Sequence, residues 1–326
     1  MSIMEVKVVK VKALGKHPNA DNLSITHVYD YPVITRTGDF KEGDKAVYVP
    51  VDAVVKTDDP RFSFLKGHNC QRIKARKLRG IFSMGLLIPA DPEWQEGEDV
   101  SERLGITKYE QPIPVNMGGD NESDPGFIPK YTEIENIRRW PDILIEGEDV
   151  VISEKLHGTN ARFVFKDGRL WVGSHNTIKK ESPNSLWWKA ARQYELDKKL
   201  RIYPGCVFYG EIYGSVQDLK YGTKQGEIKL AIFDIYSIEQ GRYADQNTKI
   251  NFLYTLGLEG VPTLYSGPWS ADKIVYTSGK STLADHIREG IVIKPTTERY
   301  DERVGRVVFK SISEEYLLRK DGTENH

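Results

Sequence analysis

Lys155 is the residue whose type and surroundings point most directly to chemistry. It follows the apolar run Val150–Ile152, and Gly158 comes three residues after it. A lysine amine becomes a nucleophile once it loses its proton, and burial at a strand end favours that loss. Gly158 has no side chain to obstruct a ligand that approaches the backbone. The pattern alone is common, and a surface lysine beside a turn would show it too.

Further charged residues border apolar segments downstream. Glu211 lies among aromatic residues, and Glu289 stands directly before the apolar segment Gly290–Ile293. Lys294 and Lys310 each end such a segment. Carboxylates and lysines together suit phosphoryl transfer, which depends on positioning and charge neutralisation. The plainer alternatives are a charge at a strand end for Glu289 and a protective charge on an edge strand for Lys310.

The composition is that of an ordinary globular protein. The chain has 326 residues, of which 39% are hydrophobic and 29% charged, and that length favours two domains. A formal net charge of -1 gives no overall signal for nucleic acid. Residues 71–79 nevertheless hold five basic residues and no acidic one, which indicates either a local nucleic-acid surface or a solvated edge strand.

The sequence predicts no membrane segment and no structural cysteine chemistry. No apolar run approaches the roughly 18 residues of a membrane span, and residues 1–7 lack a signal-peptide core. We therefore expect a cytoplasmic, monomeric protein. Cys70 and Cys206 stand far apart, which argues against a disulfide and against a thiolate zinc site.

The chain divides by composition into three segments. Residues 1–107 contain short alternating segments, such as 6–11, 46–49 and 72–76, which predict a small closed barrel. Residues 108–130 are rich in Pro, Gly, Asn and Asp, which is typical of a linker.

Residues 131–326 mix strand and helix patterns, so the expected fold class is α+β. Lys166-Asp167-Gly168 predicts a hairpin turn, and Ser182 followed by Pro183 predicts a helix start. The other predicted strands cover residues 207–209, 230–235, 290–294 and 306–310, and the other predicted helices cover 251–256 and 281–287.

Five motifs in this order resemble those of the covalent nucleotidyltransferases, the superfamily of DNA ligases, RNA ligases and mRNA capping enzymes. They are Glu154-Lys155-Leu156-His157-Gly158-Thr159-Asn160, then Glu211, Phe233-Asp234-Ile235, Glu289-Gly290-Ile291-Val292-Ile293-Lys294-Pro295 and Phe309-Lys310. The first and fourth are most similar to the RNA ligase 2 branch. The resemblance covers roughly residues 130–315 and implies an antiparallel-sheet, ATP-grasp-like ligase domain.

The resemblance implies a catalytic and a metal-binding set. Lys155 would attack the α-phosphate of ATP, release pyrophosphate and carry AMP. Glu289 and Lys310 would act with it, and Glu289 and Glu211 would hold Mg²⁺ or Mn²⁺. His157 stands where many relatives have an aspartate, and it would be catalytic as in the RNA ligase 2 branch.

The resemblance also implies a nucleotide-binding set. Glu211 would hold the ribose, Phe233 would stack on adenine, and Lys294 and Lys310 would contact phosphates. Glu154 and Asn160 would complete this set. The plainer alternative for Phe233 is a core residue of an apolar strand.

Two departures from the family pattern remain open. Relatives often have an arginine after the serine of the motif that follows the nucleophile, whereas this chain has Ser174-His175-Asn176. Either His175 or Asn176 would replace that arginine. The last motif often has two lysines, and here Lys310 acts alone or Arg306 assists it.

The first segment resembles the tRNA-binding type of OB fold through residues 17–23 and 77–88. This resemblance implies a surface for RNA ends, on or beside the basic segment 71–79. The alternative is that residues 18–21 form only a turn. Because 16 residues follow Lys310, we expect no OB domain after the catalytic segment, an order similar to the Deinococcus-type RNA ligases.

The predicted function is that of an ATP-dependent RNA ligase. It would form lysyl-AMP, pass AMP to a 5′-phosphate, and seal that end to a 3′-OH at nicks whose 3′-OH strand is RNA. The alternatives are a capping-type guanylyltransferase and a catalytically inactive RNA-binding protein.

Overall fold

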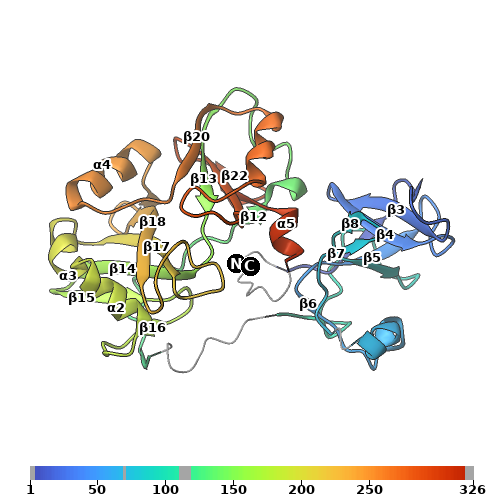
Figure 1. The fold of residues 1–326 in the computed structure, drawn as a ribbon, viewed down its shortest axis with the longest axis horizontal. Helices are drawn as coiled ribbons and strands as arrows, with labels where there is room; N and C mark the ends of the chain where they lie inside the picture. Colours follow the sequence, from blue (N-terminus) through green and yellow to red (C-terminus); the bar gives the residue numbers. More distant parts are fainter. Residues whose placement is uncertain (1–3, 69–70, 110–118, 320–326) are drawn as a thin grey trace. The chain divides into compact units, whose positions relative to one another are not determined.

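The computed structural model describes residues 4–68, 71–109 and 119–319, and they form two compact units (Figure 1). The first unit holds the described residues up to 109, with Arg138–Trp140 and residues 317–319. The second holds residues 119–137 and 141–316. In this part of the chain, no helix is long and apolar enough to cross a membrane.

The first unit is a small barrel of short antiparallel strands. The sheets have the orders β1-β5-β9, β2-β3-β4, β7-β8 and β10-β6. Their strands are β1 (Lys7–Lys10), β2 (Gly15–Lys16), β3 (Leu23–Val28), β4 (Tyr31–Arg36), β5 (Lys45–Val49), β6 (Ala53–Val54), β7 (Arg76–Leu78), β8 (Ile81–Ser83), β9 (Leu86–Pro89) and β10 (Thr107–Lys108), with the 3₁₀ helix η1 (Pro60–His68).

β5 is buried on both faces and contributes side chains to two apolar clusters of the barrel. Val47 and Val49 pack in one apolar cluster with Val8, whereas Ala46 and Tyr48 pack in another on the opposite face. Successive side chains of a strand point to opposite faces, so one strand can supply two cores. The predicted strand over residues 72–76 is wrong in position, because Ile73 exchanges backbone hydrogen bonds with Asp52 and Ala53 and β7 begins at Arg76.

The second unit contains two main sheets and thereby confirms the predicted α+β class. The seven-stranded sheet has the order β11-β16-β15-β14-β17-β18-β19 and is antiparallel. Its strands are β11 (Asn121–Glu122), β14 (Thr159–Lys166), β15 (Arg169–Gly173), β16 (Ile178–Lys179), β17 (Cys206–Gly214), β18 (Ile228–Ser237) and β19 (Arg242–Tyr243).

The five-stranded sheet has the order β12-β24-β21-β13-β20, with one parallel pair, β12 and β24. Its strands are β12 (Glu135–Asn136), β13 (Asp149–Lys155), β20 (Thr263–Pro268), β21 (Gly290–Pro295) and β24 (Phe309–Ile312), and a hairpin of β22 (Tyr300–Asp301) and β23 (Gly305–Arg306) lies between β21 and β24 in the chain. The helices are α2 (Leu186–Gln193), α3 (Leu196–Lys199), α4 (Gln246–Leu256) and α5 (Glu314–Leu317), with η2 (Ile137–Arg139), η3 (Leu200–Ile202) and η4 (Ala271–Thr277).

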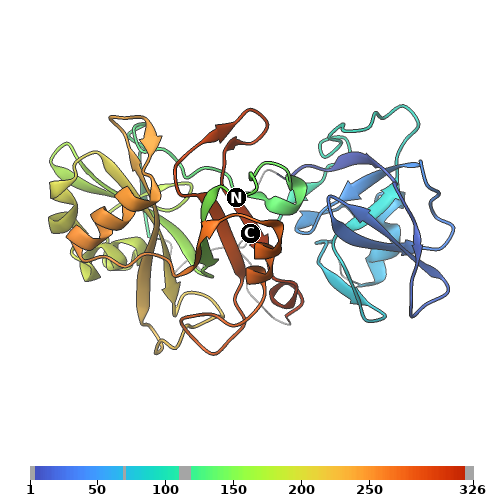
Figure 2. The same cartoon turned by 90° about the horizontal axis from the view of Figure 1, so that it is seen from above.

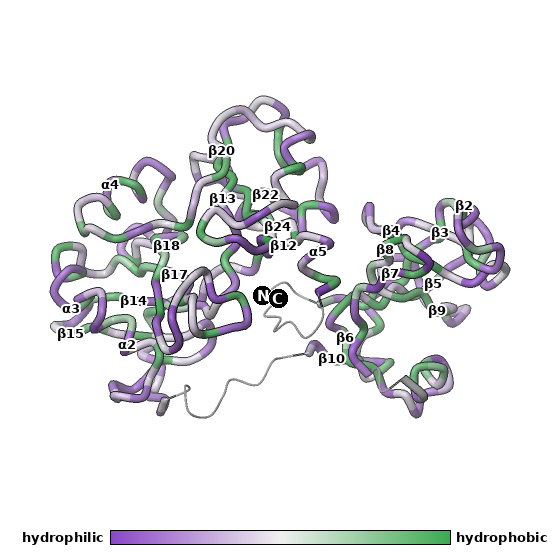
Figure 3. The backbone as a smooth tube through the Cα atoms, viewed as in Figure 1, coloured by the Kyte–Doolittle hydropathy of each residue, from purple (hydrophilic) through white to green (hydrophobic). Residues whose placement is uncertain are grey.

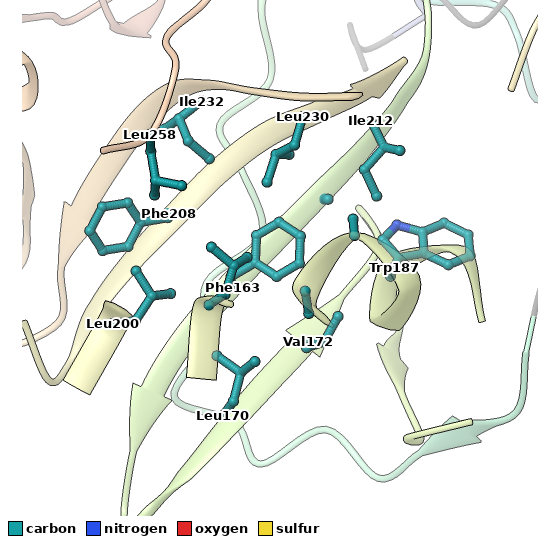
Figure 4. Packing of buried hydrophobic residues seen from close by; sticks show 14 of the residues in the cluster. Phe163, Leu170, Val172, Trp187, Leu200, Phe208, Ile212, Leu230, Ile232 and Leu258 are labelled. Carbon is teal, nitrogen blue, oxygen red and sulfur yellow. The ribbon is translucent and has the colours of Figure 1, made fainter. Parts of the chain in front are cut away.

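The main core lies between α2, α3 and α4 and one face of the seven-stranded sheet (Figure 2). Figure 4 shows Phe163 and Phe208 from neighbouring strands, packed with Trp187 of α2. Figure 3 marks the apolar stretches of these strands in green. The opposite face of the sheet has a second apolar cluster, which includes Val164, Val207 and Tyr209.

The structure contains the predicted hairpin turn and the predicted helix after Ser182, but the helix begins later than predicted. Asp167 and Gly168 both adopt positive φ, at 54° and 79°, as the predicted two-residue hairpin turn requires. The predicted helix after Ser182 starts later, because Ser185 is the N-cap of α2 and accepts a hydrogen bond from the Trp188 amide.

Three other expected elements differ from the structure. Residues 281–287 form a bend instead of a helix, and the Ser281 amide donates a hydrogen bond to the His286 carbonyl oxygen. The expected strand over 306–310 is interrupted between β23 and β24. Within the expected linker 108–130, Asn121 and Glu122 form β11 and Ile128 is buried, so residues 119–130 belong to the second unit.

We predict that Phe163→Ala lowers the free energy of unfolding of the second unit by about 3–5 kcal/mol, because it leaves a cavity under the helices. Urea unfolding followed by tryptophan fluorescence measures this. Tyr254→Ala is the control, since Tyr254 is 88% exposed and its loss should change the value by about 0.5 kcal/mol or less. A loss below about 1 kcal/mol for Phe163→Ala would contradict the assigned core.

Candidate active site

Lys155 ends β13 and forms an ion pair with Glu289. Its Nζ lies 2.5 Å from Glu289 Oε1, and the Lys155 side chain is 20% exposed whereas that of Glu289 is 1% exposed. β13 pairs with β21, and Lys155 stands directly opposite Gly290. The strand register therefore brings the two motif residues together although they are far apart in sequence.

Three predicted lysines share one face of the five-stranded sheet. Lys310 pairs with Val292, and Lys294 pairs with Val151. Paired residues lie on the same face, and so do residues two apart in a strand. Lys155, Lys294 and Lys310 accordingly point to one side, as a phosphate-binding surface requires.

Gly290 is required by its neighbours in the sheet. A Cβ at this position would lie 2.1 Å from the carbonyl oxygen of Ser311, which no side chain can tolerate. The close approach fixes Glu289 at the strand start. Gly158 is required in the same way, because its Cβ would lie 2.2 Å from the Ile212 carbonyl oxygen. Strand packing alone therefore requires a glycine here, and the expected approach of a ligand to the Gly158 backbone stays a prediction.

Glu211 approaches this site from β17 of the other sheet. Burial raises the pKa of Glu211 to about 8, and the negative charge of Glu289 adds to this rise, whereas Lys155 and a hydrogen bond from the Gly158 backbone oppose it. At neutral pH most of this carboxyl is protonated. Asn160 lies directly opposite Glu211 on β14, and its buried Oδ1 has no hydrogen-bond partner within residues 4–68, 71–109 and 119–319.

The two carboxylates fit a divalent cation that is completed by other ligands. Glu289 Oε2 is buried and accepts no hydrogen bond from the residues that the structure describes. Within the described ranges, no group of three or more His, Cys, Asp or Glu side chains could hold a metal ion. Mg²⁺ is commonly bound through one or two carboxylates together with substrate phosphates and water, which is what Glu289 and Glu211 offer.

His157 is buried and held on both ring nitrogens. Its Nε2 lies 2.7 Å from Asp218 Oδ1, and its Nδ1 lies 2.9 Å from the Tyr316 hydroxyl. The His157 amide donates to the Tyr221 hydroxyl at 2.7 Å. The sequence did not indicate Asp218, Tyr221 or Tyr316, because they lie outside the motifs.

The side chain of Glu154 lies on the opposite face from Lys155, since the two residues are adjacent in β13. Its Oε2 accepts hydrogen bonds from the amide and hydroxyl of Thr282, both at 2.8 Å. The structure therefore does not bring the Glu154 carboxylate to the lysine face.

Phe233 lies at the β-bulge of β18 and is partly exposed. Its ring packs edge-on against Tyr131 at 4.8 Å between centroids, and it lies 6.5 Å from Tyr209. A bulge re-aims a side chain, which suits a residue at a binding site.

Lys294 belongs to a buried group of charges that the motifs predicted only in part. Its Nζ lies 2.9 Å from Asp234 and 3.2 Å from Glu298. Arg306 pairs with the same two carboxylates, at 2.6 Å and 2.5 Å. Burial alone would raise the pKa of Asp234, but Arg306 and Lys294 hold it below its usual range. Arg306 is thus engaged by Asp234 and Glu298.

The remaining motif positions contribute less to this geometry. Lys310 is buried on the lysine face. His175 Nε2 lies 3.7 Å from Glu133, and Ser174 closes a turn with Thr177. No described contact joins His175 or Asn176 to Lys155, so the structure does not choose between them.

In the basic segment of the first unit, Ile73 and Ala75 are buried, whereas most of the basic side chains are exposed. Arg72 pairs with Asp52 and lies over the Tyr109 ring at 3.9 Å, so its charge is used within the unit. Lys74, Lys77 and Arg79 are exposed, and among the described residues they form no ion pair.

His17 and Asn19 hold the turn that carries this basic segment. His17 Nε2 lies 3.2 Å from the Leu78 carbonyl, and Asn19 Nδ2 donates to the Arg79 carbonyl at 2.9 Å. Residues 17–19 therefore do more than form a turn of their own. They fix the tip of the β7–β8 hairpin.

We predict that burial of Glu211 makes the second unit less stable as pH rises. The folded-state pKa of about 8 lies above that of an unfolded glutamate, so the folded state holds an extra proton between pH about 4.5 and 8 and loses this advantage as pH rises. Urea unfolding of wild type and Glu211→Gln in EDTA should differ by up to about 1.4 kcal/mol per pH unit in this window. Parallel pH profiles would contradict the assignment.

Comparisons with known proteins agree with this architecture. A family model described as RNA ligase matches residues 148–312, and one described as an OB-fold domain matches residues 5–90. A search of the curated proteins found no match. The predicted OB-fold barrel is thereby confirmed.

Solved structures of the RNA ligase of Naegleria gruberi are similar over nearly the whole chain. The one with pyrophosphate is 28% identical, covers 97% of this chain and 98% of its own, and has a TM-score of 0.85. Two variants of this ligase, one with ATP and Mn and one with AMP and Mn, are each 27% identical to this chain, with a TM-score of 0.83. Both matches cover 96% of this chain. They cover 98% of the variant with ATP and 97% of the variant with AMP.

The RNA ligase model spans half of the chain, and the matched segment contains Lys155, Glu211, Glu289 and Lys310. The similarity to solved structures extends this match over both units. This chain therefore belongs to the RNA ligase family.

Proposed function

We propose that this protein is an ATP-dependent RNA ligase that works through a lysyl-AMP intermediate. The observation that carries the proposal is the Lys155–Glu289 pair, which lies at one end of a face with two further lysines and beside Glu211. ATP and Mn in structures of the similar Naegleria gruberi ligase support ATP as substrate. A protein that consumes ATP in this way would act inside the cell.

In the first step, Lys155 Nζ attacks the α-phosphorus of ATP. A nitrogen–phosphorus bond forms, the bond to the bridging oxygen breaks, and pyrophosphate leaves. The amine must lose a proton, and Glu289 Oε1 at 2.5 Å is the acceptor within reach. Lys294 and Lys310 face the same side and would neutralise phosphate charge.

In the later steps, AMP passes from Lys155 to a 5′-phosphate, and the neighbouring 3′-OH attacks that phosphate and expels AMP. Holding two ends together can lower a barrier by about 7–11 kcal/mol. A nucleic-acid-binding surface on each of the two units would suit such a task. We propose a nick with an RNA 3′-OH strand as the substrate and a monomer as the acting form.

Glu289 and Glu211 would hold the divalent cation, which when bound neutralises phosphate charge and orients attacking groups. The unpartnered Glu289 Oε2 supports this placement. Glu211 would have to release its proton, because a nearby cation favours the ionised carboxylate.

The other nucleotide contacts would come from the seven-stranded sheet. Glu211 and Asn160 are paired across β14 and β17, and Asn160 Oδ1 is an acceptor in need of a donor, such as a ribose hydroxyl. Phe233 would stack on adenine from the bulge of β18, a contact that contributes about 1–3 kcal/mol. Glu154 would contribute to nucleotide binding through its backbone, or by holding the segment that contains Thr282 with its carboxylate.

We predict that the wild-type protein incubated with Mg²⁺ and α-labelled ATP carries label on a denaturing gel, whereas Lys155→Ala and Lys155→Arg carry none. Arginine keeps the charge but cannot serve as the nucleophile. Lys224→Ala, an exposed lysine of the same unit, is the control and should label fully. Label from GTP alone would favour a capping-type guanylyltransferase, and no label from either nucleotide would favour an inactive RNA-binding protein.

We further predict that the β7–β8 hairpin, together with Lys74 just before it, binds the RNA backbone. Replacing Lys74, Lys77 and Arg79 by alanine should weaken RNA binding and reduce the slope of log affinity against log salt by about 0.7 for each lost phosphate contact. Fluorescence anisotropy over a salt series measures this.

The matched control for the hairpin replaces Lys10, Lys12 and Arg36, which are also exposed and carry the same total charge. It should change binding less than the hairpin variant does. Equal losses in both variants would reduce the effect to net charge and refute a specific role of the hairpin.

A further inference from the structure

His157 lies within a chain of hydrogen bonds that spans three segments of the second unit. Asp218 comes from the loop after β17, and Tyr316 comes from α5. His157 is 1% exposed and Tyr316 is fully buried, and their rings meet edge-on at 5.5 Å between centroids. Such a buried imidazole can turn little, so its partners decide which nitrogen carries a proton.

The partners on the two nitrogens are chemically different. An ionised carboxylate only accepts hydrogen bonds, so Asp218 requires a proton on His157 Nε2. In a neutral imidazole the other nitrogen is then an acceptor, and the Tyr316 hydroxyl can donate to Nδ1 at 2.9 Å. Asp218 and Tyr316 thus favour the same tautomer from opposite sides of the ring.

This tautomer has a consequence for Glu289. Nδ1 lies 3.8 Å from Glu289 Oε2, a buried oxygen to which no group in the described part of the chain donates a hydrogen bond. With no proton on Nδ1, His157 cannot donate to Glu289. One oxygen of the carboxylate is then occupied by Lys155, and the other stays open toward a cation.

We propose that Asp218 and Tyr316 are positioning residues for the ligase reaction: they hold His157 in the Nε2–H tautomer and so keep Glu289 Oε2 from being taken by a hydrogen bond. This inference rests on the proposed role of Glu289 and adds two residues to the site. It also gives the histidine at this position a task that an aspartate would not need.

Asp218→Asn tests the tautomer directly. The side-chain amide can present its NH₂ to Nε2, which permits a proton on Nδ1, within reach of Glu289 Oε2. Tyr316→Phe keeps the ring packing and removes only the hydroxyl that donates to Nδ1. Asp285→Asn is the matched control, because Asp285 is 85% exposed and pairs only with Lys280 among the described residues.

The first readout is the ¹⁵N spectrum of the histidine side chains in the full-length protein, in EDTA, with the His157 signals assigned by their loss in His157→Ala. We expect the Nε2–H pattern in wild type and in Asp285→Asn, and a gain of Nδ1–H in Asp218→Asn. Wild-type signals of the Nδ1–H tautomer or of a doubly protonated ring would overturn the proposal.

The second readout is the single-turnover rate of lysyl-AMP formation over a Mg²⁺ series. Asp218→Asn should lower the rate at limiting Mg²⁺ by about 10–100-fold, with part of the loss recovered at saturating Mg²⁺. Tyr316→Phe should show the same trend, and Asp285→Asn should stay within about two-fold of wild type. Unchanged rates in both test variants, with melting temperatures equal to wild type, would overturn the proposal.

The two readouts separate this inference from the proposed function. If wild type forms no lysyl-AMP, the ligase function fails, and the ¹⁵N spectrum still decides the tautomer. If wild type forms lysyl-AMP and Asp218→Asn keeps the Nε2–H pattern, the positioning role fails and the ligase function stands. A loss of rate that saturating Mg²⁺ does not relieve in either variant would assign Asp218 a purely structural role and also refute the proposal.

Discussion

The ion pair between Lys155 and Glu289 requires one particular register between β13 and β21 of the five-stranded sheet. The two residues are 134 positions apart and reach each other only because Lys155 stands opposite Gly290 in the β13–β21 pairing. A shift of one residue would turn Lys155 to the other face. Gly290 also contacts the neighbouring strand β24, because its lack of a side chain allows close approach to the Ser311 backbone.

The same unit stabilises more buried charge than its active chemistry needs. Lys294 and Arg306 share Asp234 and Glu298, and Tyr131 also donates to Asp234 at 2.9 Å. Buried ions are tolerated when each has a partner, and removing one partner is costly. Lys294 is thus held by its neighbours before any phosphate arrives, whereas Lys155 keeps partial exposure.

The sequence predicted the candidate site residues that the strand register brings together, but not the residues that hold them in place. Motif order located Lys155 and Glu289, and turn chemistry located Asp167, because these signals are local. Segment 281–287 looked helical, yet in the structure Glu154 from a distant strand binds the Thr282 amide, and tertiary contacts override weak helix propensity. Asp218 lies 61 residues from its partner His157 and shows no periodic pattern, so pattern reasoning could not have found it.

The asymmetry of the central pair agrees with its proposed use. A fully buried pair would resist separation, because breaking it leaves an uncompensated charge at a cost of about 3–5 kcal/mol. Here the Glu289 side chain is buried, whereas the Lys155 side chain is 20% exposed, so its amine can move toward a phosphorus atom. Once Glu289 has passed the accepted proton on to solvent, the ionised carboxylate needs another positive charge in place of the amine. The open Glu289 Oε2, beside a histidine that other residues hold away from it, is where such a charge would bind.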